Sequence, residues 1–131
     1  TLRHIIADDT KWWKIIFDYS ETFKKKIIDT PTVIQFFNKE SGMDLTPIFK
    51  QYLETTTIPT LAYKTEKDNF YYYWKDVNPD FNMPIDIEYG NKIVRLYPTT
   101  KEQKIKLKRL KKSDSNQIND NKFFINIVKI D

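Results

Sequence analysis

The 131-residue sequence contains no cysteine, only two glycines and a single histidine. The absence of cysteine excludes disulfides, thiolate metal sites and cysteine nucleophiles. With so few glycines there is no Gly-rich loop to cradle a phosphate and no G-x-S-x-G turn to present a nucleophilic serine. No run of about 18 apolar residues is present, so the sequence predicts no membrane-spanning helix.

The residues that could carry hydrolytic chemistry are few. His4 has no HExxH motif around it, and a zinc site needs several ligands, so we interpret it as a partly buried helix residue. Asp76 and Asp80 are most simply loop acids. Asp86 and Glu88 alternate with isoleucines, as on the solvated side of a strand, and do not indicate a glycosidase pair. The sequence predicts no catalytic, cofactor-binding or metal-binding residue.

The chain has enough apolar residues for a core, because 40% of it is hydrophobic and 15% is aromatic. Its length fits one ordinary domain or two small packed units. The net charge of +4 is unevenly spread, since segment 101–112 holds seven basic residues and one acid. Subtracting this +6 leaves −2 for the remainder, so the basic character is local.

The first half carries the signals of helices. Between residues 30 and 60 we predict a helix pair, with Thr30 and Thr46 as N-caps and a proline after each. Gly42 is expected to end the first of these helices, and Pro59 to follow the second.

A preceding helix is predicted from Asp8 and Asp9 onward, with residues 24–26, three lysines, in its last turn. Its apolar stripe is Trp12, Ile15, Ile16, Tyr19 and Phe23. Leu2, Ile5 and Ile6 are expected to be the end of a still earlier helix.

The second half alternates as strands do. Strands are predicted over 60–66 and 69–75 with a turn at 67–68, and over 83–89 and 92–98 with a turn at 90–91. Two further strands are expected at 103–110 and 124–130, separated by a polar loop over 113–121. The predicted fold class is α+β: a helical subdomain of about three helices over residues 1–58, then a small antiparallel β-sandwich over residues 59–131.

Two surface features have a structural and a functional interpretation. The run Phe70–Trp74 places aromatic residues on both sides of a strand, which a central packed strand explains, although such rings also stack sugars or bases. The basic run 101–112 could attract nucleic acid or an anionic membrane, but its alternation with Ile105 and Leu107 favours a half-exposed strand.

Two segments, TLRHIIADDTKWW and FNKESGMDLTPIFKQYLETTTIPTL, resemble the end of the helical region in the aminopeptidase-N-like zinc metallopeptidases, the gluzincins. The resemblance covers residues 1–62 and departs mildly at Ala7, where the family usually has glycine, and at Tyr52, where tryptophan is common. The matching residues are Leu2, Arg3, Asp8, Asp9 and Trp12 in the first segment, and Phe37, Gly42, Asp44, Leu45, Phe49, Gln51, Tyr52, Leu53, Pro59 and Leu61 in the second.

In that family the HExxH zinc ligands, a further glutamate and the catalytic tyrosine lie upstream of this region. The resemblance therefore implies a non-catalytic C-terminal fragment of a zinc aminopeptidase, inactive alone, with zinc only in the full-length parent. The start at Thr1 without methionine agrees with a fragment or a processed product. The usual location of the family's members, together with an amino-acid composition typical of bacterial proteins, indicates a periplasmic or secreted parent.

The expected partner is the N-terminal catalytic domain of the same polypeptide, and no nucleic-acid partner is expected. Self-association is expected through apolar surface at Leu2, Ile5, Ile6, Trp12, Trp13 and Phe17. Two alternatives remain open. One is a free-standing β module that binds a peptide or glycan through Tyr71 or Tyr73, and the other is a nucleic-acid-binding module that uses segment 101–112.

Overall fold

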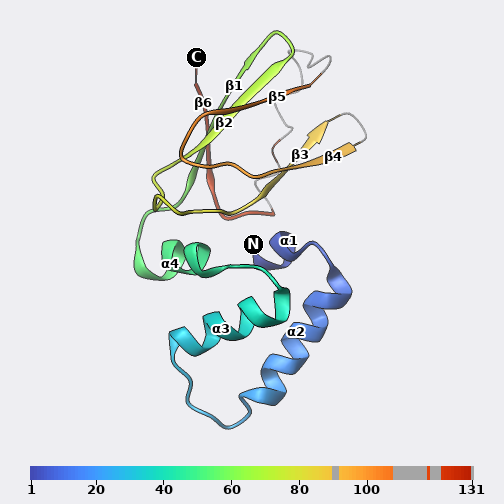
Figure 1. The fold of residues 1–131 in the computed structure, drawn as a ribbon, viewed down its shortest axis with the longest axis vertical. Helices are drawn as coiled ribbons and strands as arrows, with labels where there is room; N and C mark the ends of the chain where they lie inside the picture. Colours follow the sequence, from blue (N-terminus) through green and yellow to red (C-terminus); the bar gives the residue numbers. More distant parts are fainter. Residues whose placement is uncertain (90–91, 108–117, 119–121, 131) are drawn as a thin grey trace.

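The computed structural model describes residues 1–89, 92–107, 118 and 122–130. Helices occupy one end of an elongated molecule and strands the other, so the α+β fold class is confirmed (Figure 1). Four helices are described, the first being the short helix expected from Leu2, Ile5 and Ile6. The helices are α1 (Leu2–Ile6), α2 (Asp9–Thr22), α3 (Thr30–Ser41) and α4 (Thr46–Glu54).

Two of the predicted helix ends are confirmed. The Asp8 side chain caps α2 by accepting a hydrogen bond from the Lys11 backbone N–H at 2.9 Å. Gly42 follows α3 with φ of 71°, the left-handed conformation that glycine adopts without strain. Both residues therefore stop or start a helix by local chemistry that the sequence displays.

Other helix ends differ from the prediction. Asp29, and not Thr30, caps α3, because its carboxylate accepts from the Thr32 N–H at 3.0 Å and a carboxylate also suits the helix dipole. Thr46 is already helical, and the residue before it, Leu45, caps α4 without a side-chain hydrogen bond. The lysines at 24–26 lie beyond α2, which ends at Thr22, and Lys25 has φ of 57°, which no helix accommodates.

The strands form two sheets. β1 and β2 have the predicted bounds, and Lys67 takes φ of 54° in the turn between them. The four-stranded sheet has the order β5-β2-β1-β6, and β3 pairs with β4 in a second sheet. The strands are β1 (Thr60–Glu66), β2 (Asn69–Lys75), β3 (Ile85–Tyr89), β4 (Lys92–Leu96), β5 (Gln103–Lys106) and β6 (Asn126–Lys129). The predicted turn at 90–91, Leu110 and most of the predicted loop 113–121 lie outside the described residues.

One pairing corrects the predicted antiparallel arrangement. β6 runs parallel to β1, with Thr60 opposite Asn126, whereas the other described pairs are antiparallel. The chain enters β6 from the side of the helices, as it enters β1, and the Asn126 N–H donates to the Pro59 carbonyl at 2.8 Å. Packing of the two sheets as a sandwich remains a prediction.

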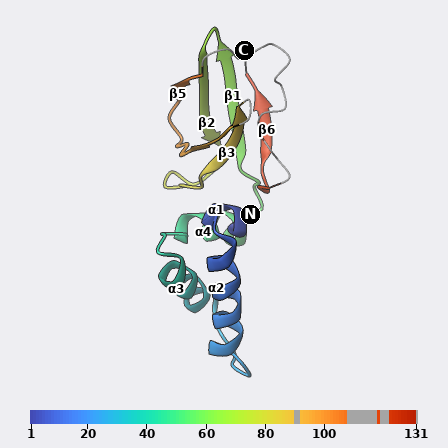
Figure 2. The ribbon, with the colours of Figure 1, turned by 90° about the vertical axis from the view of Figure 1, so that its right-hand side faces the viewer.

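The buried side chains of the two halves form one cluster. Ile5 and Ile15 from the helices belong to it together with Leu61, Trp74 and Ile85 from the strands. In Figure 2, α1 and α4 are the helices nearest the sheets. The change from helix to strand falls between Glu54 and Thr60, and the division into domains at 58/59 remains a prediction.

The central strand β2 explains the aromatic run. Phe70, Tyr72 and Trp74 are buried on one side, and Tyr71 and Tyr73 are half-buried on the other. On the neighbouring edge strand, Lys104 and Lys106 are exposed while Ile105 is half-buried, as the alternation predicts. Residues 108–112 of the basic run lie outside the described residues.

Candidate functional site

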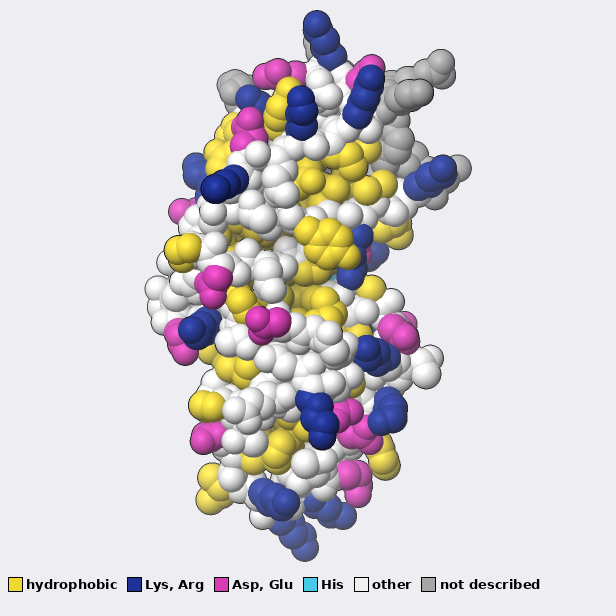
Figure 3. Space-filling model, viewed as in Figure 1, with side chains coloured by type: hydrophobic (Ala, Val, Ile, Leu, Met, Phe, Trp, Pro, Cys, Tyr) yellow, Lys and Arg dark blue, Asp and Glu magenta, His cyan; other side chains and the backbone are white. Residues whose placement is uncertain are grey.

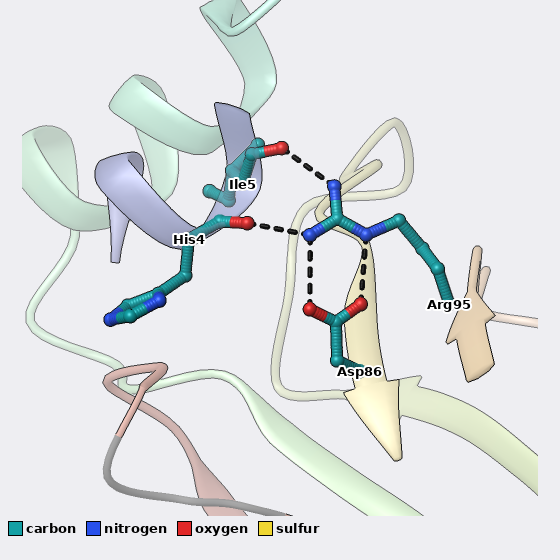
Figure 4. Close-up of polar contacts among 4 residues, drawn as sticks. All are labelled: His4, Ile5, Asp86 and Arg95. Carbon is teal, nitrogen blue, oxygen red and sulfur yellow. Dashed lines mark hydrogen bonds and ion pairs between the residues drawn. The ribbon is translucent and has the colours of Figure 1, made fainter. Parts of the chain in front are cut away.

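Arg95 on β4 links the β3–β4 hairpin to the end of α1 (Figure 4). Its Nε lies 2.8 Å from Asp86 Oδ1 and its Nη2 lies 3.0 Å from Asp86 Oδ2, which makes a bidentate ion pair. The same guanidinium donates from Nη1 to the Ile5 carbonyl at 2.7 Å and from Nη2 to the His4 carbonyl at 2.5 Å. One side chain therefore joins elements about ninety residues apart in the sequence.

The β3–β4 hairpin and the end of α1 both have local structure that favours this contact. The hairpin register places Asp86 opposite Arg95 on one face of the sheet. Helix α1 ends at Ile6 and is followed by Ala7 with φ of 55°, and carbonyls in the last turn of a helix have no partner within it. A cation at that end also suits the helix dipole. The hydrogen bonds that Arg95 donates to Asp86 raise the pKa of Arg95, so the guanidinium stays charged.

This ion pair corrects the expectation that Asp86 is a solvated strand acid. Its side chain is 16% exposed, against 23% for Arg95. The sequence prediction missed Arg95, and the available signal was a basic residue facing an acid across a predicted hairpin.

Gln51 on α4 is the second contact between the halves. It is 1% exposed, and its Nε2 donates to the Thr57 carbonyl at 2.9 Å and to the Asp76 carbonyl at 3.2 Å. Its Oε1 accepts from the Asn78 N–H at 2.9 Å. The amide thus ties α4 to the segment between α4 and β1 and to the loop after β2. In the sequence, Gln51 is distinguished only as a matching residue of the second segment.

An open polar pocket of about 370 Å³ lies beside Gln51. Asp76 in its wall is exposed and has φ of 60°, in the left-handed region. The carbonyls of Thr57 and Asp76 each accept a hydrogen bond from the Gln51 amide. The lining residues are Gln51, Thr55, Thr57, Asp76, Val77 and Asn78.

Tyr52, the neighbour of Gln51, anchors the entrance to β6. Its hydroxyl donates to the Phe124 carbonyl at 2.6 Å, and its ring lies 6.2 Å from the Phe124 ring. Burial raises the pKa of Tyr52, which keeps this hydroxyl protonated as a donor. The Phe124 N–H in turn donates to Thr1 Oγ1 at 3.0 Å, so the same backbone unit meets α4 and the residue before α1.

His4 lies beside this joint as a half-buried helix residue, as predicted. Its ring is 6.1 Å from the ring of Phe123 and tilted by 53°. Burial lowers its pKa, and the nearby cations Lys122 and Arg3 act in the same direction. The ring is therefore held in an environment that disfavours the imidazolium.

The acids considered in the sequence do not come together. Asp76, Asp80 and Glu88 are exposed, and Asp86 is committed to Arg95. Across residues 1–89, 92–107, 118 and 122–130, no group of three or more His, Cys, Asp or Glu side chains could hold a metal ion. None of the described helices is long and apolar enough to cross a membrane.

The outer face of α2 carries two exposed aromatic side chains. Trp13 and Phe17 are 58% and 63% exposed, as predicted, and the Arg3 guanidinium lies 5.6 Å from the centre of the Trp13 ring. The prediction is wrong for Ile5, which is fully buried because the helix turns it into the shared core. Trp12 is half-buried against Phe37, and Leu2 and Ile6 are also half-buried.

On the face shown in Figure 3, Lys and Arg side chains lie at both ends of the long axis and also along its sides, and hydrophobic side chains are exposed at several places, including the middle. The middle is the joint that Arg95, Gln51 and Tyr52 hold together. The contacts at this joint can position elements, and they offer no nucleophile or general base aligned with a reactive partner.

No protein-family model matches the chain, and no curated protein matches it.

Proposed function

We propose that this chain is a non-catalytic, structural region of a zinc aminopeptidase-like protein, whose catalytic residues lie in another part of that protein. The observation that carries this proposal is the buried Gln51 amide, a residue of the resemblance that holds the two halves together. Asp8, Gly42 and Tyr52 belong to the same resemblance and likewise cap, end or anchor elements. A motif of this kind specifies packing and not chemistry.

Zinc belongs, in this proposal, to the parent and not to this chain. A catalytic zinc needs three protein ligands and an open position for water. The sequence offers one histidine and no HExxH motif, and the described acids lie apart. We therefore assign no step of peptide hydrolysis to residues of this chain.

The outer face of α2, formed by Trp13 and Phe17, is proposed to pack on the N-terminal catalytic domain of the same polypeptide. These residues are one helical turn apart and more than half exposed. Burying a large apolar side chain contributes about 1.5–3 kcal/mol, so covering both would stabilise the parent substantially. The same face would drive self-association of the chain when that domain is absent.

The test is the size and activity of the native gene product. An antibody against this chain should detect, in source cells, a band several times larger than 15.8 kDa. Immunoprecipitated material should cleave aminoacyl-nitroanilide substrates, lose that activity with a chelator and regain it with zinc. The isolated 131-residue chain serves as the inactive control. A native band at 15.8 kDa, or a large product without chelator-sensitive peptidase activity, would overturn the proposal.

A further inference from the structure

Two features that are separate in the sequence share one face of the four-stranded sheet. Tyr71 on β2 lies directly opposite Lys104 on β5, and Asn69 lies opposite Lys106. Residues directly opposite each other in an antiparallel pair project on the same side. Tyr73 and Lys75 follow on the same side of β2, because side chains alternate along a strand. The fold therefore places lysines of the basic run beside tyrosines of the aromatic run.

This side is the outer face of the sheet. The opposite side of β2 is taken up by Phe70, Tyr72 and Trp74, which are buried in the core. On the outer face, Tyr71 and Tyr73 are half-buried, in contrast to the buried aromatic residues of the other side. The two are separated by two residues of strand, or roughly 6.6 Å.

The charge on this face is predominantly positive. Lys75, Lys104 and Lys106 are exposed. A fourth lysine, Lys64, lies 4.9 Å from the centre of the Tyr71 ring and is held by carboxylates, at 3.6 Å from Glu66 and 3.8 Å from Glu102. Lys64 and these two acids together carry a charge of −1, so with Lys75, Lys104 and Lys106 the charged groups around Tyr71 and Tyr73 sum to +2.

We propose that this face binds single-stranded nucleic acid, independently of the proposed peptidase relationship. Bases stack on Tyr71 and Tyr73, and the exposed lysines at 75, 104 and 106 contact the phosphates. Rings on an open sheet combined with flanking cations are the arrangement by which proteins hold single strands without reading sequence. A duplex keeps its bases stacked internally, so it offers only its phosphates to this face.

Binding is measured by fluorescence anisotropy with a labelled oligo(dT) of about 12 nucleotides, a length within the usual site size. With three phosphate contacts, log K should fall with log salt with a slope of about −2. Tyr71→Leu and Tyr73→Leu should each weaken binding about 5- to 150-fold, the usual range for losing one stacked base. Lys104→Ala with Lys106→Ala should weaken binding and flatten the salt dependence.

Matched controls exist elsewhere in the chain. Tyr97→Leu removes a tyrosine that is 64% exposed just after β4, and Lys24→Ala with Lys26→Ala removes two exposed lysines from the segment after α2. Both should bind as the wild type does. If a leucine variant fails to fold, the proposal is tested with the double lysine variant on β5. Its two side chains are exposed, so their removal should leave the fold intact.

Three results would overturn the proposal. The first is unchanged affinity in the folded tyrosine variants or in the β5 lysine variant. The second is equal affinity for a duplex of the same length, which would mean attraction to phosphate alone. The third is tighter binding of a sulfated glycan than of oligo(dT), which would make this a glycan-binding face.

Discussion

Asp86 and Arg95, nine residues apart, form a bidentate ion pair. The Arg95 guanidinium also donates hydrogen bonds to two backbone carbonyls of α1. The pair is mostly buried, so each charge depends on the other for compensation. The joint between helices and sheets therefore has an ionic contact at one side and the Gln51 amide at another.

Arg95→Met should lower the free energy of unfolding by about 3 kcal/mol, because it leaves Asp86 without its partner and frees two carbonyls of α1. Chemical denaturation measures the change. Lys14→Ala, which removes an exposed pair with Asp18 on α2, is the control and should have little effect. Equal effects of the two substitutions would show that burial of the Arg95 pair contributes nothing.

Gln51→Ala should destabilise the protein by about 3 kcal/mol, since it leaves the Asn78 N–H and the carbonyls of Thr57 and Asp76 without the hydrogen-bond partner that Gln51 provides. Gln35→Ala, on the exposed side of α3, should stay within about 0.5 kcal/mol. Thermal and denaturant unfolding of both variants make the comparison. A much smaller loss of stability in Gln51→Ala would mean that water or a neighbouring side chain replaces the hydrogen bonds of the amide.

His4 should make stability depend on pH. Its pKa is lowered in the folded state from an ordinary value of 6.5, so the unfolded chain binds the proton more readily. This contribution is complete above about pH 6.5 and is lost as the pH falls toward the folded pKa. His4→Gln should flatten the unfolding free energy between about pH 5 and 7. An unchanged slope would show that other groups control this range.

Trp13→Ser combined with Phe17→Ser should reduce hydrophobic-dye binding and self-association without changing stability by more than about 0.5 kcal/mol, because both side chains are mostly exposed. Sedimentation velocity over a concentration series gives the association state. Trp12→Ala, which removes a half-buried ring near Phe37, should instead lower stability. Undiminished association of the double variant would place the contact surface elsewhere.

Gly42→Ala should lower the free energy of unfolding by about 1 kcal/mol through backbone conformation alone. The glycine has φ of 71°, and an added Cβ would meet no atom within 4 Å, so the penalty is conformational and not steric crowding by neighbours. Gly42→Asn should cost less, since asparagine tolerates the left-handed region better. Similar unfolding midpoints for glycine and alanine would indicate that α3 ends differently in solution.

The sequence predicted best where structure follows from neighbours along the chain. β1 and β2 were predicted with their observed bounds, because alternation and the turn at Lys67 are local signals. Gly42 and Asp8 were identified for the same reason. The cap of α3 was misplaced by one residue because Asp29 and Thr30 are both capping types, and only the contact to Thr32 distinguishes them.

Contacts between distant segments were beyond the reach of such patterns. Asp86 reads as a solvated strand acid until Arg95 and α1 are placed against it. Ile5 was expected at the surface, but its burial depends on strands that follow more than fifty residues later. The parallel direction of β6 likewise depends on Tyr52 and Thr1 holding Phe124 beside the helices.

The pairing of β6 with β1 has a consequence for synthesis on the ribosome. Thr60 emerges long before its partner Asn126, so one edge of β1 stays uncovered while the intervening chain is translated. An uncovered edge can pair with another nascent chain, and pairing of such distant segments is slow to form. The helices can form early during translation, but the four-stranded sheet is complete only after β6, its last strand, has left the exit tunnel.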